Sequence, residues 1–599
     1  MACVLRRTGF VILALLIGLS LLPQVSRSQE KPQSRVLVLK GATVIDGLGH
    51  QPIPNAVIVI EGDKVKSFGG ADTSYPADAN VVDLSGKYII PGLVDCHVHY
   101  QPWLGELFLN YGVTSICEPG GNNDHGEREA SYRSDERSPR IFASQGRPAF
   151  RPNMNHEQVV QAMQEWLKKK PDFANFDVYN ERNKQQWQWA AEVAHEAGLM
   201  VFGHTENAPA SIEAGEDVVE HLWGFAEALM TPEELQGFRQ GKYLHWGLFL
   251  KESPRRDQLI ADAVRRGVIL NPTLVYELGS QSPVAHKHEL ELYNLFADPN
   301  LMTYFPEDRA VGSLYKFRSV RNFSTRYESP VAFPNLSSED FRQFQEAYRL
   351  VGEFVKKWVQ DGGKIFGGTD DPSSGMGGIT LHIEMEMLTE PPIGLTPMQA
   401  LETEESWGAA LLAGRNKTST QPPVGIIAPG AFADIVVLGA DPLADITNTN
   451  KIERVIKGGE FIKLGYTPYY TEPRPQSSTI PHNPEPEISA ITPHAVVEGG
   501  PDVDITVEGV GFTGNSQIRI DGVPVPTTFV DIRTLKAKVP AAVVARALPN
   551  RFIQPGPEQL TGVYGDRTVK ITVFNAPPDG GLSGSVSIRV TSKDAKGGG

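Results

Sequence analysis

Two histidines separated by one residue, His97 and His99, follow the apolar run 88–94. Such a run, bounded by turn signals, predicts a buried strand. Residues two apart in a strand point to the same face, so both imidazoles would enter the same space. Two imidazoles at the end of a strand can form half of a metal site. Alone the pair is a weak signal, because His-x-His also arises by chance.

Four further polar residues stand just past apolar, strand-like runs of their own: Glu118, His204, His221 and Asp370. A single histidine at such a place is more often a polar residue satisfied by its neighbours than a ligand. The joint pattern, with each candidate at the end of its own strand, instead predicts a site of four histidines and one aspartate.

This ligand set suits hydrolysis. Imidazole and carboxylate favour Zn²⁺ and similar divalent ions. Such an ion lowers the pKa of bound water from about 15.7 to about 7 and polarises a substrate carbonyl. Asp370 could take the proton of that water and pass it to the leaving nitrogen. Asp371, the next residue, is expected to face solvent or to cap a helix.

The elements that would position these residues alternate between helix and strand patterns. A helix pattern over 185–197 precedes the strand 198–204, and a helix ending near residue 266 precedes the strand 267–273. Repetition of this unit predicts an α/β fold, a parallel (β/α)₈ TIM barrel with insertions over residues 91–424. Active sites of such barrels lie at the carboxyl ends of the strands.

Other segments have short-strand patterns with turns. These are residues 29–90 and 425–466 on either side of the barrel, and residues 485–592 after a linker at 467–484 that is rich in Pro, Ser, Thr and Glu. Alternation and glycine turns in the last segment predict a small all-β, immunoglobulin-like sandwich.

The N-terminus, residues 1–28, is predicted to be a cleaved secretory signal peptide, which places the mature protein outside the cytoplasm, secreted or periplasmic. A transmembrane anchor is the alternative, although the apolar core is short for a span of about 20 residues. Without this segment only Cys96 and Cys117 remain, so no disulfide framework is expected, while a single bridge stays open.

The composition is that of a soluble globular protein, with 40% hydrophobic and 21% charged residues. A formal net charge of −15, with no basic stripe, argues against a nucleic-acid partner. No second segment is apolar enough to cross a membrane, so none is expected to span one after signal cleavage. The predicted partner is a small-molecule substrate of the hydrolytic site.

Several motifs along the chain belong together: the runs 91–99, 112–116, 194–198, 219–221, 368–370, and 430–438 with 441–443. Through them residues 35–465 resemble the amidohydrolase superfamily, particularly its imidazolonepropionase and Xaa-Pro dipeptidase-like branch. The resemblance implies a barrel flanked by a composite β-sandwich built from both ends. It implies His97, His99, His204, His221 and Asp370 as metal ligands, with Asp370 also the proton-transfer base.

One position departs from that pattern. Many members of this branch have a carboxylated Lys after the fourth strand that bridges two metals, and here Asp177 stands in its place. Asp177 could reach a metal as a carboxylate substitute, or could leave a mononuclear site. We therefore expect one Zn²⁺ or other divalent ion, and a second if Asp177 bridges; loss of activity is the third outcome. Tyr179 could donate to a developing oxyanion, or could pack in the barrel.

Side chains around the predicted ligands have two interpretations each. Tyr100, Trp103 and Trp223 could line an apolar substrate pocket or belong to the core. Arg147 and Arg151 could hold a substrate carboxylate or lie in solvent.

Residues 485–592 resemble the IPT/TIG family of immunoglobulin-like domains through the runs 486–493, 505–512 and 535–541. The resemblance implies a spacer, or a module that contacts proteins or glycans, without catalysis.

The combined expectation is an exported metal-dependent amidohydrolase that cleaves a C–N bond of a dipeptide or cyclic amide. Two alternatives remain: a mononuclear deaminase of a cyclic amidine, and an inactive barrel that serves as a binding scaffold.

Overall fold

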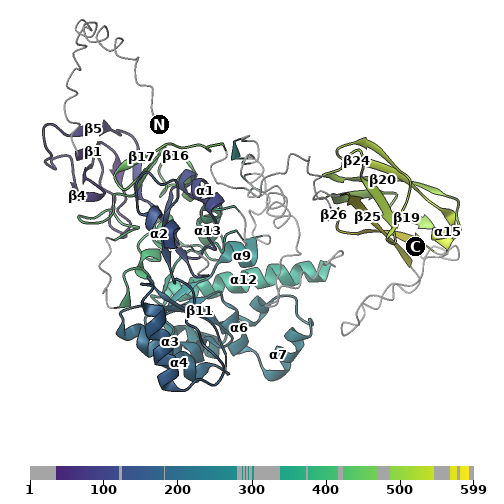
Figure 1. The fold of residues 1–599 in the computed structure, drawn as a ribbon, viewed down its shortest axis with the longest axis horizontal. Coiled ribbons are helices and arrows are strands. Elements are labelled where there is room, and N and C mark those ends of the chain that lie inside the picture. Colours follow the sequence, from purple (N-terminus) through teal and green to yellow (C-terminus); the bar gives the residue numbers. More distant parts are fainter. Residues whose placement is uncertain are drawn as a thin grey trace, which may run out of the picture.

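The computed structural model describes residues 36–120, 125–180, 182–279, 338–372, 376–415, 423–468, 486–545, 567–576 and 581–591, with single residues between 287 and 301 (Figure 1). The predicted signal peptide and nearly all of the predicted linker lie outside these residues, as does the side chain of Asp177. In the described part of the chain, no helix is both long and apolar enough to cross a membrane.

The central unit is a set of parallel strands in two sheets. One has the order β7-β8-β9 and the other the order β10-β11-β12-β13-β14. Every pairing within them is parallel, as the alternating helix and strand patterns predicted. The strands are β7 (Leu93–Asp95), β8 (Val113–Glu118), β9 (Arg140–Ala143), β10 (Ala174–Tyr179), β11 (Val201–Thr205), β12 (Val218–Glu220), β13 (Ile269–Asn271) and β14 (Lys364–Ile365).

Helices follow these strands and lie outside the sheets (Figure 1). Several begin at a residue whose side chain caps the free backbone N–H groups of the first turn, such as Asn155 before α3 and Ser253 before α8. The helices are α1 (Gly105–Asn110), α2 (His125–Ser131), α3 (His156–Leu167), α4 (Lys184–Glu196), α5 (Ala208–Glu213), α6 (Trp223–Leu229), α7 (Pro232–Arg239), α8 (Pro254–Arg265), α9 (Leu274–Leu278), α12 (Ser338–Gln360), α13 (Ile379–Thr389) and α14 (Pro397–Thr403).

Hydrogen bonds join the edges of the two sheets. The amide of Asp172, just before β10, donates to the carbonyl of Ala143 at 2.9 Å. At the other edge the amide of Cys96 donates a hydrogen bond to the carbonyl of Gly367 at 3.1 Å. Val98 also forms a parallel β-bridge with Asp371. Strand order, direction and these edge contacts agree with a TIM-barrel-type fold, in which the carboxyl ends of the strands gather at one face.

Two further sheets combine the chain on both sides of this unit. One has the order β4-β3-β1-β5 and the other the order β17-β16-β15-β6-β2, in which β15 pairs antiparallel with β6. One apolar cluster includes Ile58 and Ile60 from the first sheet and Ile89, Ile435 and Ile456 from the second. The strands are β1 (Val36–Lys40), β2 (Thr43–Val44), β3 (Val57–Glu61), β4 (Lys64–Gly69), β5 (Asn80–Asp83), β6 (Tyr88–Pro91), β15 (Ile435–Leu438), β16 (Ile452–Lys457) and β17 (Glu460–Ile462).

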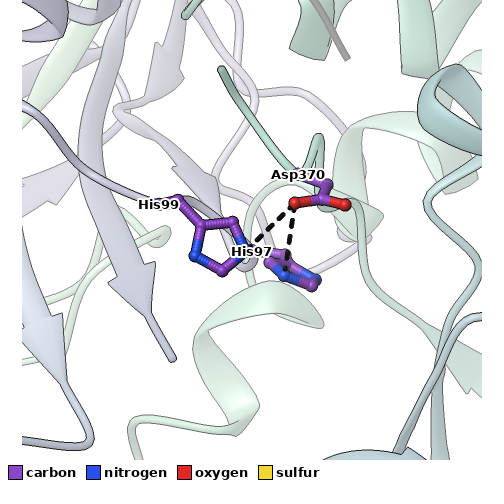
Figure 2. A group of neighbouring side chains, drawn as sticks. All are labelled: His97, His99 and Asp370. Atoms are coloured by element: carbon purple, nitrogen blue, oxygen red, sulfur yellow. Dashed lines mark ion pairs between the residues drawn. The ribbon is translucent and has the colours of Figure 1, made fainter. Parts of the chain in front are cut away.

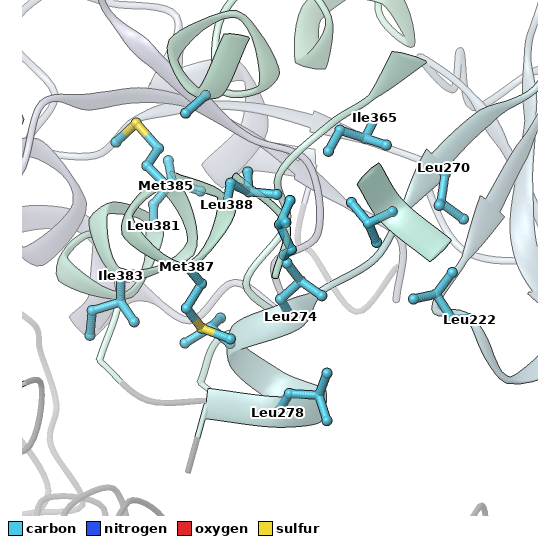
Figure 3. Packing of buried hydrophobic residues seen from close by; sticks show 14 of the residues in the cluster. Leu222, Leu270, Leu274, Leu278, Ile365, Leu381, Ile383, Met385, Met387 and Leu388 are labelled. Atoms are coloured by element: carbon cyan, nitrogen blue, oxygen red, sulfur yellow. The ribbon is translucent and has the colours of Figure 1, made fainter. Parts of the chain in front are cut away.

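The largest apolar cluster packs the helices against the strands. Figure 3 shows Leu274 and Leu278 of α9 beside Leu381, Met387 and other residues of α13, with Leu270 of β13 and Ile365 of β14 close by. Nearly every side chain of α13 is buried. This packing fixes α9 and α13 at the carboxyl ends of β13 and β14.

The C-terminal domain is all β, as predicted. Its sheets have the orders β18-β20-β24-β23 and β19-β27-β25-β21-β22, and Ile505, Val507, Ile518 and Ile571 contribute to its core. The elements are β18 (Glu487–Thr492), β19 (Ala495–Val497), β20 (Val503–Val510), β21 (Gln517–Ile520), β22 (Val523–Pro524), β23 (Thr527–Asp531), β24 (Thr534–Val539), α15 (Ala541–Ala545), β25 (Arg567–Asn575), β26 (Gly581–Leu582) and β27 (Val586–Thr591).

Candidate metal centre

The structure brings the four predicted histidines together at the carboxyl ends of the parallel strands. His97 and His99 follow β7, His204 lies in β11, and His221 follows β12. The ring centroid of His97 is 5.2 Å from that of His99, 6.1 Å from that of His204 and 5.6 Å from that of His221. His204 and His221 are 5.0 Å apart. These distances place all four imidazoles around one small volume.

Asp370 enters the same volume from the loop after β14. Its Oδ1 lies 3.2 Å from Nε2 of His99 and 3.6 Å from Nε2 of His97 (Figure 2). Asp370 and His97 are buried, whereas the side chain of His99 is 45% exposed. The group therefore has an open side at His99.

Backbone geometry at the strand ends turns these side chains inward. His221, Thr273 and Asp370 have φ values of 57°, 43° and 56°. This left-handed region is rare for residues other than glycine and costs of order 1–3 kcal/mol each. Three strained residues therefore lie at neighbouring strand ends, and such strain is found preferentially at functional sites.

Glu220 is a further member of the cluster that the sequence reasoning did not select. Its Oε1 lies 2.7 Å from Nδ1 of His97 and accepts a hydrogen bond from the Asn271 amide at 3.0 Å, and its Oε2 lies 3.6 Å from Nε2 of His204. A charged residue inside a strand expected to be buried on both faces was the available signal.

Within the described residues, two groups have the spacing for an ion: His97 with His99 and Asp370, and His97 with Glu220 and His221. Some of their buried polar atoms have no hydrogen-bond partner among the described residues, including Nε2 of His97 and Oδ1 of Asp370. Unsatisfied buried donors and acceptors are costly and need an explanation. Imidazole nitrogens and carboxylate oxygens converging in this way fit a divalent ion such as Zn²⁺.

The charges of the cluster are strongly coupled. Burial alone would lower the pKa of His97, but the carboxylates of Glu220 and Asp370 outweigh it and raise this pKa to about 9. Burial would raise the pKa of Asp370, but His97 and His99 hold it below its usual range. Burial, with the charge of His204, lowers the pKa of His221 to about 3. His221 is therefore neutral, as a metal ligand must be, and an ion would displace a proton from His97.

A second layer of side chains surrounds the cluster. Nδ1 of His221 lies 2.5 Å from the Thr273 hydroxyl and 3.4 Å from Oε1 of Glu277. Burial and the nearby charge of Asp370 raise the pKa of Glu277 to about 8. On the other side, Asp95 accepts hydrogen bonds from the backbone N–H groups of His97 and Thr369.

Two neighbouring acidic residues have structural contacts. Glu118 is buried, accepts a hydrogen bond from the amide of Gly120 at 2.7 Å, and lies 4.0 Å from Nδ1 of His99. Asp371 is fully buried, and its carboxylate accepts a hydrogen bond from the Thr380 hydroxyl in α13. The expectation that Asp371 faces solvent is wrong, because α13 covers this turn.

Tyr179 and Asp177 are not placed among the histidines by any described contact. The Tyr179 ring is buried in a cluster with α3 and α4 residues and packs edge-on against Trp187 at 5.6 Å. Tyr179 pairs in register with Thr205, one residue beyond His204. The backbone of Asp177 lies in β10, where the register shifts, and its side chain is outside the described residues.

Of the aromatic and basic residues that were candidates for the substrate pocket, some lie beside the histidines and others lie elsewhere. Trp223 lies 5.9 Å from the ring of His204 and 6.2 Å from that of His221, whereas Trp103 is buried in the large apolar cluster. Tyr100 packs against the same cluster. Arg147 and Arg151 line a surface cavity of about 840 Å³ beside α3. Burial lowers the pKa of His204, and the charge of Arg147 lowers it further. Cys96 and Cys117, the two cysteines within the described residues, are free and buried.

Comparison with known proteins supports both resemblances. Residues 486–596 match the model of the IPT/TIG domain family. A dihydroorotase from Trichlorobacter lovleyi is 46% identical over 67 residues, 11% of this chain and 15% of that protein. An imidazolonepropionase from Cereibacter sphaeroides is 41% identical over 61 residues, 10% of this chain and 15% of that protein. The chain thus spans about 15% of the length of these relatives.

Solved structures that match this chain at low sequence identity include molinate hydrolase and a putative prolidase from Bifidobacterium longum. Molinate hydrolase is 17% identical with a TM-score of 0.49, and the match covers 74% of this chain and 99% of the hydrolase chain. The prolidase is 20% identical with a TM-score of 0.48, and the match covers 73% of this chain and 97% of the prolidase chain. The resemblance to amidohydrolases and to the IPT/TIG family, predicted from the motifs, is confirmed by these matches.

Proposed function

We propose that this protein is a metal-dependent amidohydrolase that cleaves a C–N bond of a small amide, such as a dipeptide or a cyclic amide. The observation that carries the proposal is the convergence of His97, His99, His204, His221 and Asp370, from four strands or strand ends, on one volume that contains unsatisfied buried ligand atoms. The curated relatives that match a part of this chain include enzymes named dihydroorotase and imidazolonepropionase.

The ion would be held by His97, His99, His204, His221 and Asp370, with Glu220 able to contribute from its place between His97 and His204. When bound, a divalent ion such as Zn²⁺ activates water and polarises a carbonyl oxygen. The two described groups that have the spacing for an ion share His97, and Asp177 would add a carboxylate to a second ion.

Asp370 is the residue that we assign to proton transfer. Its carboxylate is ionised, because the neighbouring imidazoles hold its pKa below its usual range although burial raises it. The open side of the cluster at His99 gives substrate and water access to this carboxylate. An ionised carboxylate at this position can accept the proton of attacking water and return it to the leaving nitrogen. Trp223, next to His204 and His221, would contact an apolar part of the substrate.

A panel of dipeptides, N-acyl amino acids and cyclic amides tests this assignment. We expect amine and carboxylate release by the parent, and a loss of at least about 100-fold in rate for Asp370→Asn, since general acid–base catalysis contributes about 10²–10⁴-fold. Asp371→Asn, which changes a buried neighbour outside the cluster, should retain most of the rate if it folds. Turnover by Asp370→Asn at the parent rate would exclude this role.

A mononuclear deaminase of a cyclic amidine is the second candidate. It is favoured by Asp177, which stands where the related branch has a bridging Lys. Release of ammonia, without a new primary amine, would identify it. An inactive scaffold is the third, and is distinguished by absence of metal.

We also propose that the parallel strands close into a complete barrel beside a composite β-sandwich, that the protein is exported after removal of residues 1–28, and that the IPT/TIG-like domain contacts a protein or a glycan. Fractionation of cells that produce the full chain, with N-terminal sequencing of the mature form, tests export directly.

A further inference from the structure

Two side chains, one just before α9 and one within it, contact His221. Nδ1 of His221 lies 2.5 Å from Oγ1 of Thr273 and 3.4 Å from Oε1 of Glu277. Thr273 is the residue that precedes α9, and Glu277 is four residues further along. The amide of Glu277 donates a hydrogen bond to the carbonyl of Thr273 at 3.0 Å, which fixes the two residues one turn apart. The pair therefore presents one hydroxyl and one carboxyl group to the same imidazole nitrogen.

The Glu277 side chain is held from its other side by the 3-10 helix Trp246–Phe249. The indole N–H of Trp246 donates a hydrogen bond to its carboxylate. The imidazole of His245 bonds to the main chain of Glu277, and its Nδ1 accepts a hydrogen bond from the Gly247 amide at 2.9 Å, which leaves Nε2 as the donor nitrogen. His245 and Trp246 are buried, and the Glu277 side chain is 11% exposed. The carboxylate thus has a fixed position before any ion binds.

The helix itself is anchored to α13. The buried carboxylate of Glu384 accepts hydrogen bonds from the first two amides of α9, those of Leu274 and Val275, at 2.9 and 2.6 Å. Leu274 and Leu278 pack against α13 in the apolar cluster (Figure 3). Since Thr273 has φ of 43°, an unfavourable value for a β-branched residue, the surroundings must hold it there.

We propose that Thr273 and Glu277 are positioning residues for the metal ligand His221. Together they accept the Nδ1 proton of His221, fix its ring, and leave Nε2 to face the metal with His97 and Glu220. This inference rests on the proposed metal-dependent function. A carboxylate behind a histidine ligand sets the tautomer and raises the basicity of the ring, and loss of such a partner typically weakens metal binding about 10- to 100-fold.

The test measures Zn²⁺ affinity of the full chain by competition with a chromogenic chelator, and records the visible absorption of the Co²⁺-loaded protein. Glu277→Gln and Thr273→Val each keep the shape of the side chain and should weaken Zn²⁺ binding about 10- to 100-fold. Both should change the Co²⁺ spectrum, which reports the ligand geometry. Thr273→Ser, which retains the hydroxyl, should bind Zn²⁺ as the parent does.

Glu405→Gln is the matched control, because Glu405 is also a fully buried carboxyl, has no hydrogen-bond partner, and is absent from both ligand groups. Its Zn²⁺ affinity should equal that of the parent. Parent-like affinity and spectrum in both Glu277→Gln and Thr273→Val would overturn the inference while the metal site stands. Absence of Zn²⁺ binding in the parent would instead reject the proposed function. If Glu277→Gln does not fold, the comparison of Thr273→Val with Thr273→Ser decides.

Discussion

Nδ1 of His97 lies 2.7 Å from Oε1 of Glu220, a residue more than a hundred positions away in the chain, and both side chains are almost completely buried. Asn271 donates to the same carboxylate oxygen. Each of the three residues belongs to a different strand or strand end, so the contact depends on the assembled sheets. This contact determines which nitrogen of His97 is available to an ion, because a ring nitrogen that faces a carboxylate carries the proton.

Glu220→Gln should therefore weaken metal binding. The amide keeps the volume but removes the charge that favours a proton on Nδ1 of His97, and leaves buried groups poorly paired. We expect a loss of about 10- to 100-fold in Zn²⁺ affinity, measured by chelator competition, with little change in the circular dichroism spectrum. An affinity equal to that of the parent would show that Glu220 neither binds nor orients a ligand.

Gly368→Ala should disturb the site by crowding it. A Cβ at Gly368 would lie 2.8 Å from Cβ of His97 and 2.7 Å from the Asn271 amide nitrogen. Overpacking of this kind costs about 1–3 kcal/mol and would displace His97. We expect a lower melting temperature and weaker metal binding than in the parent. Gly514→Ala, in open space in the C-terminal domain, is the control and should change neither.

Stability of the metal-free protein should fall as the pH rises from about 5 to about 8. Burial raises the pKa of Glu384 to about 8 and that of Glu405 well above its ordinary value. For a carboxyl whose pKa is raised on folding, the folded state binds more protons than the unfolded state. The stability contribution is therefore present below the unfolded pKa of about 4.3 and is lost as the pH rises through the folded value.

Urea unfolding between pH 5 and pH 9 measures this dependence. The parent should lose stability across this range, and Glu405→Gln, which cannot ionise, should lose less. A parent whose free energy of unfolding rises steadily up to pH 9 would contradict the raised pKa of these buried carboxyl groups. A Glu405→Gln variant whose free energy of unfolding changes with pH as steeply as that of the parent would contradict the part given to Glu405.

The sequence was sufficient to predict which polar residues meet where each of them follows an apolar strand pattern. His97, His99, His204, His221 and Asp370 each follow an apolar strand, and parallel strands bring their carboxyl ends to one face. Glu220, Thr273 and Glu277 could not be assigned, because their partners come from other strands and no local spacing identifies them. The buried position of Asp371 depends on the packing of α13 over the turn, which no residue near Asp371 indicates.

Elemental analysis of the mature protein, purified without chelators, tests the central claim most directly. We expect at least one equivalent of a divalent metal per chain in the parent. We expect a strongly reduced metal content in a His97→Ala, His99→Ala double variant that remains folded. Two equivalents in the parent and one in Asp177→Ala would add Asp177 as a ligand. A folded parent that contains no metal, and takes up none at micromolar free Zn²⁺, would contradict the proposed metal-dependent function.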